Sequence, residues 1–174
     1  RVFGGGADLK YLWITPTNIT DFGTIGNKER ITCDKNNLDK NAMLLVNRTS
    51  RGGRGEYVGI AMFYDVSLYG KAHHNQGIYR VAGYSDLDLS FMSCFMNCQY
   101  MREYCSGLSI GSKMKEMKAN QFLEIPFPIF PERRKIEIAD IYKNIIQLHE
   151  DTRKTKKQLE HFVQKLVIGE EIIV

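Results

Sequence analysis

The chain has 174 residues, of which 43% are hydrophobic and 25% are charged. This composition is that of a globular protein and argues against intrinsic disorder, and the length allows one packed domain with one extension. The formal net charge of +4 permits a polyanionic partner without identifying one. No apolar run approaches the roughly 20 residues that span a bilayer, and residues 1–8 lack a signal-peptide core. The sequence therefore predicts a cytoplasmic protein.

The first half of the chain is predicted to be mainly β, with long polar loops between strands. Residues 10–15 are rich in β-forming side chains, and Pro16, which cannot donate to a sheet, ends them. Residues 42–47, 57–64 and 77–81 are further apolar runs of strand length.

Three segments of this half carry side chains suited to DNA, with donors and acceptors for base edges or phosphates. They are Arg48, Arg51 and Arg54 in a glycine-rich loop; Lys71, His73, His74, Asn75 and Gln76; and Thr15, Thr17 and Asn18 after the first strand, which are chosen because their place matches a position in the family that the chain resembles, named below. Glycines allow the arginine loop a close approach to a ligand. Each segment could also be a solvated turn, Asn18 could simply cap a turn, and adjacent histidines could be metal ligands.

At residues 85–104 the apolar spacing becomes that of one amphipathic helix. Ser85 and Asp88 resemble a capping box, and Gly107 is placed to end the helix. A basic loop follows, and its Ser112, Lys113 and Lys115 suit phosphate contacts, although a flexible surface loop would have the same composition.

The four cysteines are Cys33, Cys94, Cys98 and Cys105, and they lack the paired short spacing of a zinc ribbon. The last three fall on one face of the predicted helix, where small thiols are common core residues. The sequence therefore predicts core cysteines and no metal site.

A proline-rich junction leads into the last part of the chain. Pro126 and Pro128 exclude a helix and a central strand, so an edge strand or an extended connector is expected there. Pro131 suits the first turn of a helix, and Glu132 complements the positive end of its dipole.

Residues 132–168 contain no proline or glycine and are predicted to form one long helix. Their apolar side chains recur in heptads, which indicates a coiled coil with a second helix. At 1.5 Å per residue this helix would be roughly 55 Å long, more than one domain needs for its own core. Thr152 and Thr155 make the middle of the stripe polar. The residues predicted to pair are Ile138, Ile141, Ile145, Leu148, Leu159, Phe162 and Leu166.

The sequence thus predicts an α+β protein: a β-rich globular domain at 1–131, a coiled-coil helix at 132–168 and a tail at 169–174. In their order and spacing these segments resemble the target-recognition domain and spacer helix of type I restriction-modification specificity subunits. The resemblance covers almost the whole chain. It is carried by Tyr11-Leu-Trp-Ile-Thr-Pro-Thr-Asn-Ile19, Met43-Leu-Leu-Val-Asn47 with its glycine-rich sequel, residues 107–118, and Phe122-Leu-Glu-Ile-Pro-Phe-Pro-Ile-Phe-Pro-Glu132 leading into Lys135-Ile-Glu-Ile-Ala139. Where the family usually has Glu-Gln after the prolines, this chain has Glu132-Arg133.

The resemblance implies sequence-specific recognition of double-stranded DNA by a non-catalytic chain that needs no cofactor. In the family, methyltransferase subunits bind S-adenosylmethionine and methylate adenine, and restriction subunits join through them. A family member has two recognition domains and two antiparallel spacer helices, whereas this chain has one of each. The chain is therefore expected to be a half-subunit that forms a homodimer, or a fragment of a longer protein.

Two other interpretations remain open from the sequence. The chain could be the DNA-recognition domain of a single-chain restriction-modification enzyme. It could also be a coiled-coil assembly module whose loops do not bind DNA. Catalysis by the chain itself is not expected, because Phe3-Gly-Gly-Gly6 is a poor methyl-donor loop and no close carboxylate-lysine nuclease cluster is present.

Overall fold

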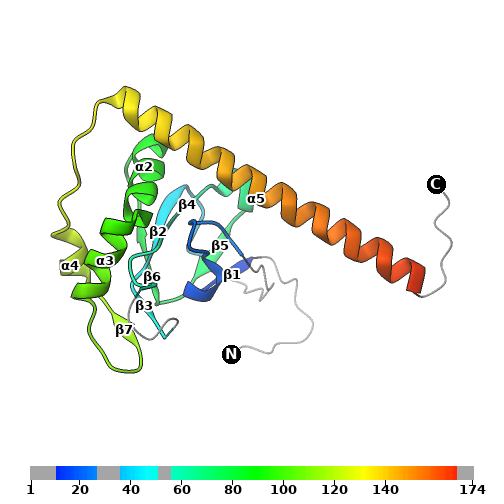
Figure 1. Cartoon of the computed structure of the whole chain (residues 1–174), viewed down its shortest axis with the longest axis horizontal. Coiled ribbons are helices and arrows are strands. Elements are labelled where there is room, and N and C mark those ends of the chain that lie inside the picture. The colour runs from blue at the N-terminus through cyan, green and yellow to red at the C-terminus, as the bar shows by residue number, and fades with distance from the viewer. Residues whose placement is uncertain (1–10, 27–35, 51–55, 168–174) are drawn as a thin grey trace. The chain divides into compact units, whose positions relative to one another are not determined.

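The computed structural model describes residues 11–26, 36–50 and 56–167. Over these ranges the chain is a mixed α+β structure with small sheets, and it ends in a long helix, as the sequence predicts (Figure 1). Two compact units are present, residues 1–139 and residues 140–174. Arg51, Arg54, Cys33 and the tail at 169–174 lie outside the described residues.

The strands are β1 Leu12–Ile14, β2 Ala42–Val46, β3 Arg48–Thr49, β4 Ala61–Tyr64, β5 Ala72–His74, β6 Ile78–Val81 and β7 Lys115–Glu116. The helices are the 3-10 turn η1 Pro16–Asn18, then α1 Val66–Tyr69, α2 Asp86–Asn97, α3 Gln99–Leu108, α4 Ala119–Leu123 and α5 Glu132–Val167.

The centre of the first unit is a three-stranded antiparallel sheet in the order β4-β2-β6. All five residues of β2 are buried, because both faces of this sheet are covered. Leu44 and Val46 belong to a core cluster with Ile14 of β1, whereas Met43 and Leu45 line a cavity together with side chains of α2 and α4. Alternate side chains of β2 therefore point to opposite faces of the sheet, where one set joins the core cluster and the other lines the cavity.

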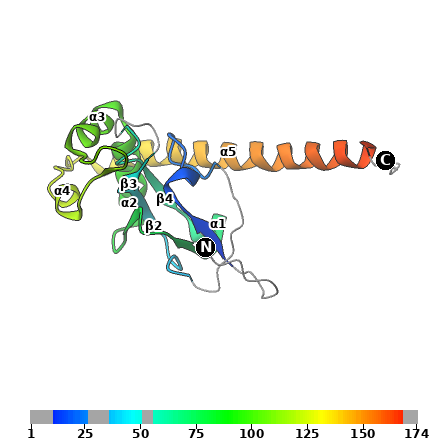
Figure 2. The same ribbon diagram turned by 90° about the horizontal axis from the view of Figure 1, so that it is seen from below.

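The other strands form two small ribbons beside this sheet. β1 and β5 pair in parallel, with Trp13 opposite His73, and β3 pairs antiparallel with β7. Figures 1 and 2 show α3 and α4 on one side of β2 and β1 on the other.

The strand predicted at 57–64 is shorter, since only Ala61–Tyr64 is regular. Val46 accepts a hydrogen bond from Gly59 and donates one to Ile60, each at 2.8 Å, so two residues face one as in a β-bulge. Gly59 has φ 86°, and a Cβ atom there would lie 2.6 Å from the Cys105 sulfur. Glycine is required here by both conformation and close packing.

The prediction of one helix over 85–104 is wrong at Cys98, where the backbone is extended with ψ 151°. α2 ends there and α3 begins. Asn97 holds the end of α2 on β4, because its side chain accepts from the Ala61 N–H at 2.9 Å and donates to the Ala61 carbonyl at 2.7 Å. Gly107 does not end the helix either, because α3 continues to Leu108. The Ser85 cap is confirmed, since its hydroxyl accepts from the Asp88 N–H at 3.1 Å.

The break at Cys98 also separates the cysteines. Cys94 is half-buried, Cys98 is exposed and Cys105 is buried, so the prediction of a core position is wrong for Cys98. Burial raises the pKa of Cys94 to about 12 and that of Cys105 to about 11. Both thiols are therefore protonated at neutral pH, as suits core residues.

The proline segment is a connector with no regular secondary structure, and aromatic contacts hold it to α2. Phe127 lies 5.2 Å from Phe95 and Phe130 lies 5.4 Å from Phe91, measured between ring centroids. At the start of α5, Lys135 pairs with Asp88 at 2.8 Å, and this bond lowers the pKa of the Asp88 carboxyl. α5 begins at Glu132, directly after Pro131, as predicted.

Along α5 the described side chains fall into two groups. Ile141, Ile145 and Leu148 are exposed, as are Leu159, Phe162 and Leu166 further along, whereas Tyr142 and Ile146 are buried. Ile138 is half-buried. Helix α5 therefore carries an exposed apolar stripe along the heptad positions that the sequence predicts for pairing. No helix in the described part of the chain is long and apolar enough to cross a membrane.

We predict that Leu44→Ala lowers the free energy of unfolding by about 2–5 kcal/mol, because Leu44 is fully buried in the central sheet. Chemical denaturation followed by circular dichroism measures this change. The matched control is Leu123→Ala, where the side chain is 86% exposed and a change within about 0.5 kcal/mol is expected. Equal losses in the two variants would show that the core is misassigned.

Candidate nucleic-acid interface

The segment after β1 is a tight turn built by its own side chains. The backbone N–H and the hydroxyl of Thr15 both donate to Oδ1 of Asn18, at 2.8 Å and 2.7 Å. The hydroxyls of Thr15 and Thr17 lie 2.8 Å apart. Asn18 thus stabilises the turn as the third residue of a capping box whose N-cap is Thr15, while Thr17 is exposed.

The turn between β5 and β6 is organised by Asn75. Its N–H donates to the carbonyl of Ile14 at 3.0 Å, and its Oδ1 accepts from the N–H of Gly77 at 2.9 Å. The side chain between them, Gln76, is exposed. Asn75 therefore shapes the turn, and Gln76 is the amide that the turn presents to solvent.

His73 and His74 support this turn from β5. The ring of His73 stacks on Trp13, with centroids 4.9 Å apart and planes 14° apart. The backbone of His74 is fixed by the Asn37 side chain, which accepts at 2.8 Å and donates at 3.2 Å.

The charge state of His74 follows from its surroundings. Desolvation lowers the pKa of its ring, and Nδ1 lies 3.0 Å from the Asn75 carbonyl. A carbonyl can only accept, so Nδ1 carries the proton. The ring is neutral at neutral pH and offers no charge to a phosphate.

Metal binding by the adjacent histidines finds no support in this part of the chain. Within the described ranges, no group of three or more His, Cys, Asp or Glu side chains is placed to hold a metal ion.

Asn47 connects the turn to two other segments, although the sequence did not single it out as a site residue. Its N–H donates to the Gly77 carbonyl at 3.0 Å, and its side-chain amide donates to the Gln76 carbonyl at 3.2 Å. Its own carbonyl accepts from the N–H of Met117 at 2.9 Å. Asn47 is only 4% exposed, so these bonds are shielded from water.

Gly77 is the second residue that sequence reasoning missed. A Cβ atom at this position would lie 2.9 Å from Cγ of Pro16 and 3.1 Å from the Arg48 carbonyl oxygen. The N–H of Arg48 also points to the Gly77 carbonyl, at 3.4 Å. The absence of a side chain lets η1, β3 and the turn at 75–77 come into contact. The Asn-Gln-Gly turn signal was visible in the sequence, but its neighbours were not.

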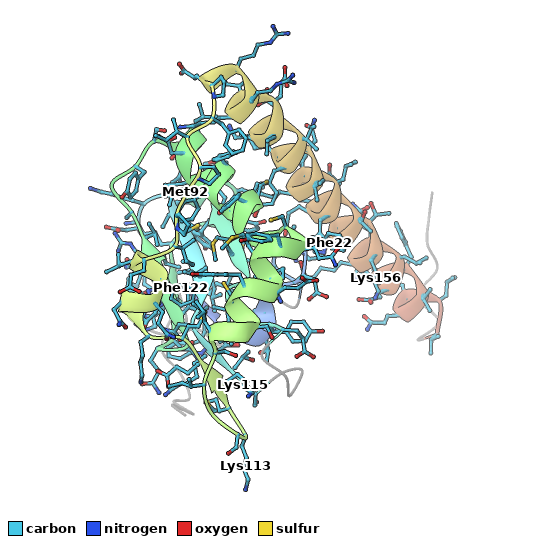
Figure 3. All side chains as sticks on the ribbon, turned by 60° about the vertical axis from the view of Figure 1, so that its left-hand side comes forward. Phe22, Met92, Lys113, Lys115, Phe122 and Lys156 are labelled. Atoms are coloured by element: carbon cyan, nitrogen blue, oxygen red, sulfur yellow. The ribbon has the colours of Figure 1, made fainter. Side chains whose placement is uncertain are left out.

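The fourth segment is a projecting loop at residues 110–116, which we call the finger. β7 at its base pairs with β3, so that Arg48 lies opposite Glu116 and Thr49 opposite Lys115. Ile110 and Glu116 exchange two backbone hydrogen bonds, each at 2.9 Å. Figure 3 shows Lys113 at the far end of the finger and Lys115 nearer its base.

The structure brings together several of the residues predicted from the sequence. Around Gly77 meet Thr15 and η1 with Thr17 and Asn18; β3 with Arg48; and the end of β5 and its turn with His73, His74, Asn75 and Gln76. The base of the finger, with Lys115, joins them through the pairing of β7 with β3, whereas Ser112 and Lys113 belong to its projecting outer part (Figure 3). Lys71 is separated from them, because it precedes β5 and the turn follows that strand. Arg51 and Arg54 follow β3 in the chain, outside the described residues.

We predict that Gly77→Ala destabilises the protein by about 1–3 kcal/mol, because the added methyl group must displace Pro16 or the Arg48 carbonyl. Thermal and chemical denaturation measure the loss. Gly107→Ala is the matched control, since nothing lies within 4 Å of its Cβ position in α3 and alanine favours a helix. An unchanged stability of the Gly77 variant would contradict the contact.

Comparison with known proteins adds no evidence about the function of these residues. A scan against models of protein families finds no match, and a search of curated proteins finds no significant relative.

Proposed function

We propose that this chain is a DNA target-recognition domain with a spacer helix, acting as a specificity subunit or half-subunit of a type I restriction-modification system. The observation that supports the proposal is the meeting of four segments around Gly77. Each was selected for side chains that suit bases or phosphates, and they are far apart in the sequence.

The exposed groups of this surface suit the two tasks of a DNA reader. Gln76 presents an amide that can donate and accept together, as recognition of an adenine edge requires. Thr17, Ser112 and Lys113 are exposed donors of the kind that hold phosphates. The polar atoms of three other residues already form hydrogen bonds that stabilise this surface. These residues are Asn18, Asn75 and His74.

The spacer helix supplies the second part of the proposal. From Ile141 to Leu166 its heptad side chains are exposed by 41% to 67%, which is unfavourable in water unless another helix covers them. The proposed cover is the same helix of a second copy, or of a second recognition half in a longer protein. Two readers joined in this way would recognise two half-sites at a spacing set by the helices.

Catalysis is proposed to lie on partner chains. Methyltransferase subunits would be directed to the target by this chain, and restriction subunits would join through them. A recognition domain within a single-chain enzyme would use the same surface. A coiled-coil assembly module is the alternative of another class, and it requires no DNA affinity at all.

Binding to duplex DNA tests the proposal directly. We predict that the protein selects a preferred sequence from a pool of random duplexes and that its affinity falls with salt. The double variant Lys113→Gln/Lys115→Gln should flatten the slope of log affinity against log salt by about 1–2, since each phosphate contact contributes about 0.9. The matched control, Lys40→Gln/Arg133→Gln, removes the same charge at exposed positions outside the segments that meet at Gly77 and should keep the slope.

Gln76→Ala should change the preferred sequence with little effect on the salt slope, because a base contact carries sequence information and a phosphate contact does not. If the wild-type protein does not retard the gel migration of any duplex at low salt, DNA recognition is excluded. The coiled-coil assembly module would then be the only one of these interpretations left.

Helix pairing is tested separately. We predict that Leu159→Glu abolishes the dimer in analytical ultracentrifugation, because it places a charge in the apolar stripe. Lys157→Glu is the control, since Lys157 lies on the opposite side of the helix by heptad position and should leave the dimer intact. A monomeric wild-type chain, or a dimer unaffected by Leu159→Glu, would show that the stripe does not pair two copies.

A further inference from the structure

The finger carries apolar side chains among its basic ones. Met114, which follows the exposed Lys113 in the outer part, is 48% exposed, and Ile110 at the base is 56% exposed. A loop that only held phosphates would need no apolar group so far from the core. Figure 3 shows the end of the finger directed away from the body of the first unit, with Lys113 at its extremity.

The finger has a defined shape because its backbone is fixed at both ends. At the tip, Gly111 has φ 108°, and a Cβ atom there would collide with the Met114 carbonyl oxygen. At the base, Ile110 and Glu116 exchange two hydrogen bonds and Met117 is fully buried. Met114 is therefore presented on a short loop that is closed at its base by one β-bridge and is joined through β7 to β3.

The shape and chemistry of the finger suit one feature of duplex DNA. The major groove is about 12 Å wide and admits a two-stranded β-ribbon, so a loop closed by a single β-bridge can also enter it. The apolar group that it displays is the C5-methyl of thymine, and an exposed apolar side chain contacts it favourably. The thioether of methionine is flexible and polarizable, so it adapts to such a contact.

Building on the proposed DNA recognition, we propose that the finger enters the major groove and that Met114 reads a thymine by covering its C5-methyl. Lys113 holds an adjacent phosphate, and Ile110 lies at the base of the same loop. Met114 is then a specificity-determining residue, although its thioether sulfur is only a weak hydrogen-bond acceptor.

The test replaces thymine by deoxyuridine, one position at a time, in the duplex that the protein selects from a random pool. This change removes the methyl group and keeps every hydrogen-bonding group of the base. For the wild-type chain at least one replacement should lower the affinity about fourfold, as expected for exposing one methyl-sized apolar group. The Met114→Ala variant should bind the thymine and deoxyuridine duplexes equally, with an unchanged salt slope.

Two further variants separate this contact from a general effect on folding. Met114→Leu keeps an apolar side chain and should keep most of the discrimination. Ile129→Ala removes a side chain that is 99% exposed on the proline connector and should keep all of it. Circular dichroism checks that each variant is folded.

Each contrary outcome is distinct. If the wild-type chain selects no sequence, the proposed function fails and this inference fails with it. If it selects a sequence but no deoxyuridine replacement matters, or the selected site has no thymine, only the inference is overturned. A thymine effect that persists in Met114→Ala assigns the contact to another residue. An increase in 2-aminopurine fluorescence reports loss of base stacking. If this increase depended on Met114 and no deoxyuridine replacement mattered, Met114 would instead be a wedge between base pairs.

Discussion

The close contact at Gly77 is the constraint on which the candidate surface depends. Pro16 of η1 and the Arg48 carbonyl lie so near this position that no side chain fits without displacement. The backbone hydrogen bonds of Asn47 then lock the turn to the end of β2 and to the residue that follows the finger. Because the contact at Gly77 and the hydrogen bonds of Asn47 are buried and short, they fix the positions of three otherwise separate loops relative to one another.

This arrangement divides the polar residues of the surface into two roles. Asn18, Asn75 and the backbone of His74 form hydrogen bonds inside the protein, so their groups stabilise the shape of the surface. The exposed amide of Gln76 and the finger remain available for the proposed contact with DNA. A reader of DNA needs both, since side chains that recognise a base must be held in a fixed geometry by others.

Helix α5 poses a different physical problem. Its exposed apolar stripe runs well beyond Ala139, where the first compact unit ends. An isolated helix gains little stability from hydrogen bonding alone, so a stripe of this length favours association with another helix. The polar Thr152 and Thr155 at its centre would weaken such a pair slightly and would help to select one register.

The sequence by itself determined the elements that depend on local chemistry. The Ser85 cap, the helix that starts after Pro131, the heptad stripe of α5 and the buried run of β2 all follow from neighbouring residues. Tertiary structure alone decided the break at Cys98, where Asn97 bonds to Ala61, and the contact of Gly77 with Pro16 and Arg48. These features depend on partners far away in the chain, and neither periodicity nor composition contains that information. For the same reason the sequence could list the polar side chains of the candidate surface but could not tell which of them point outward.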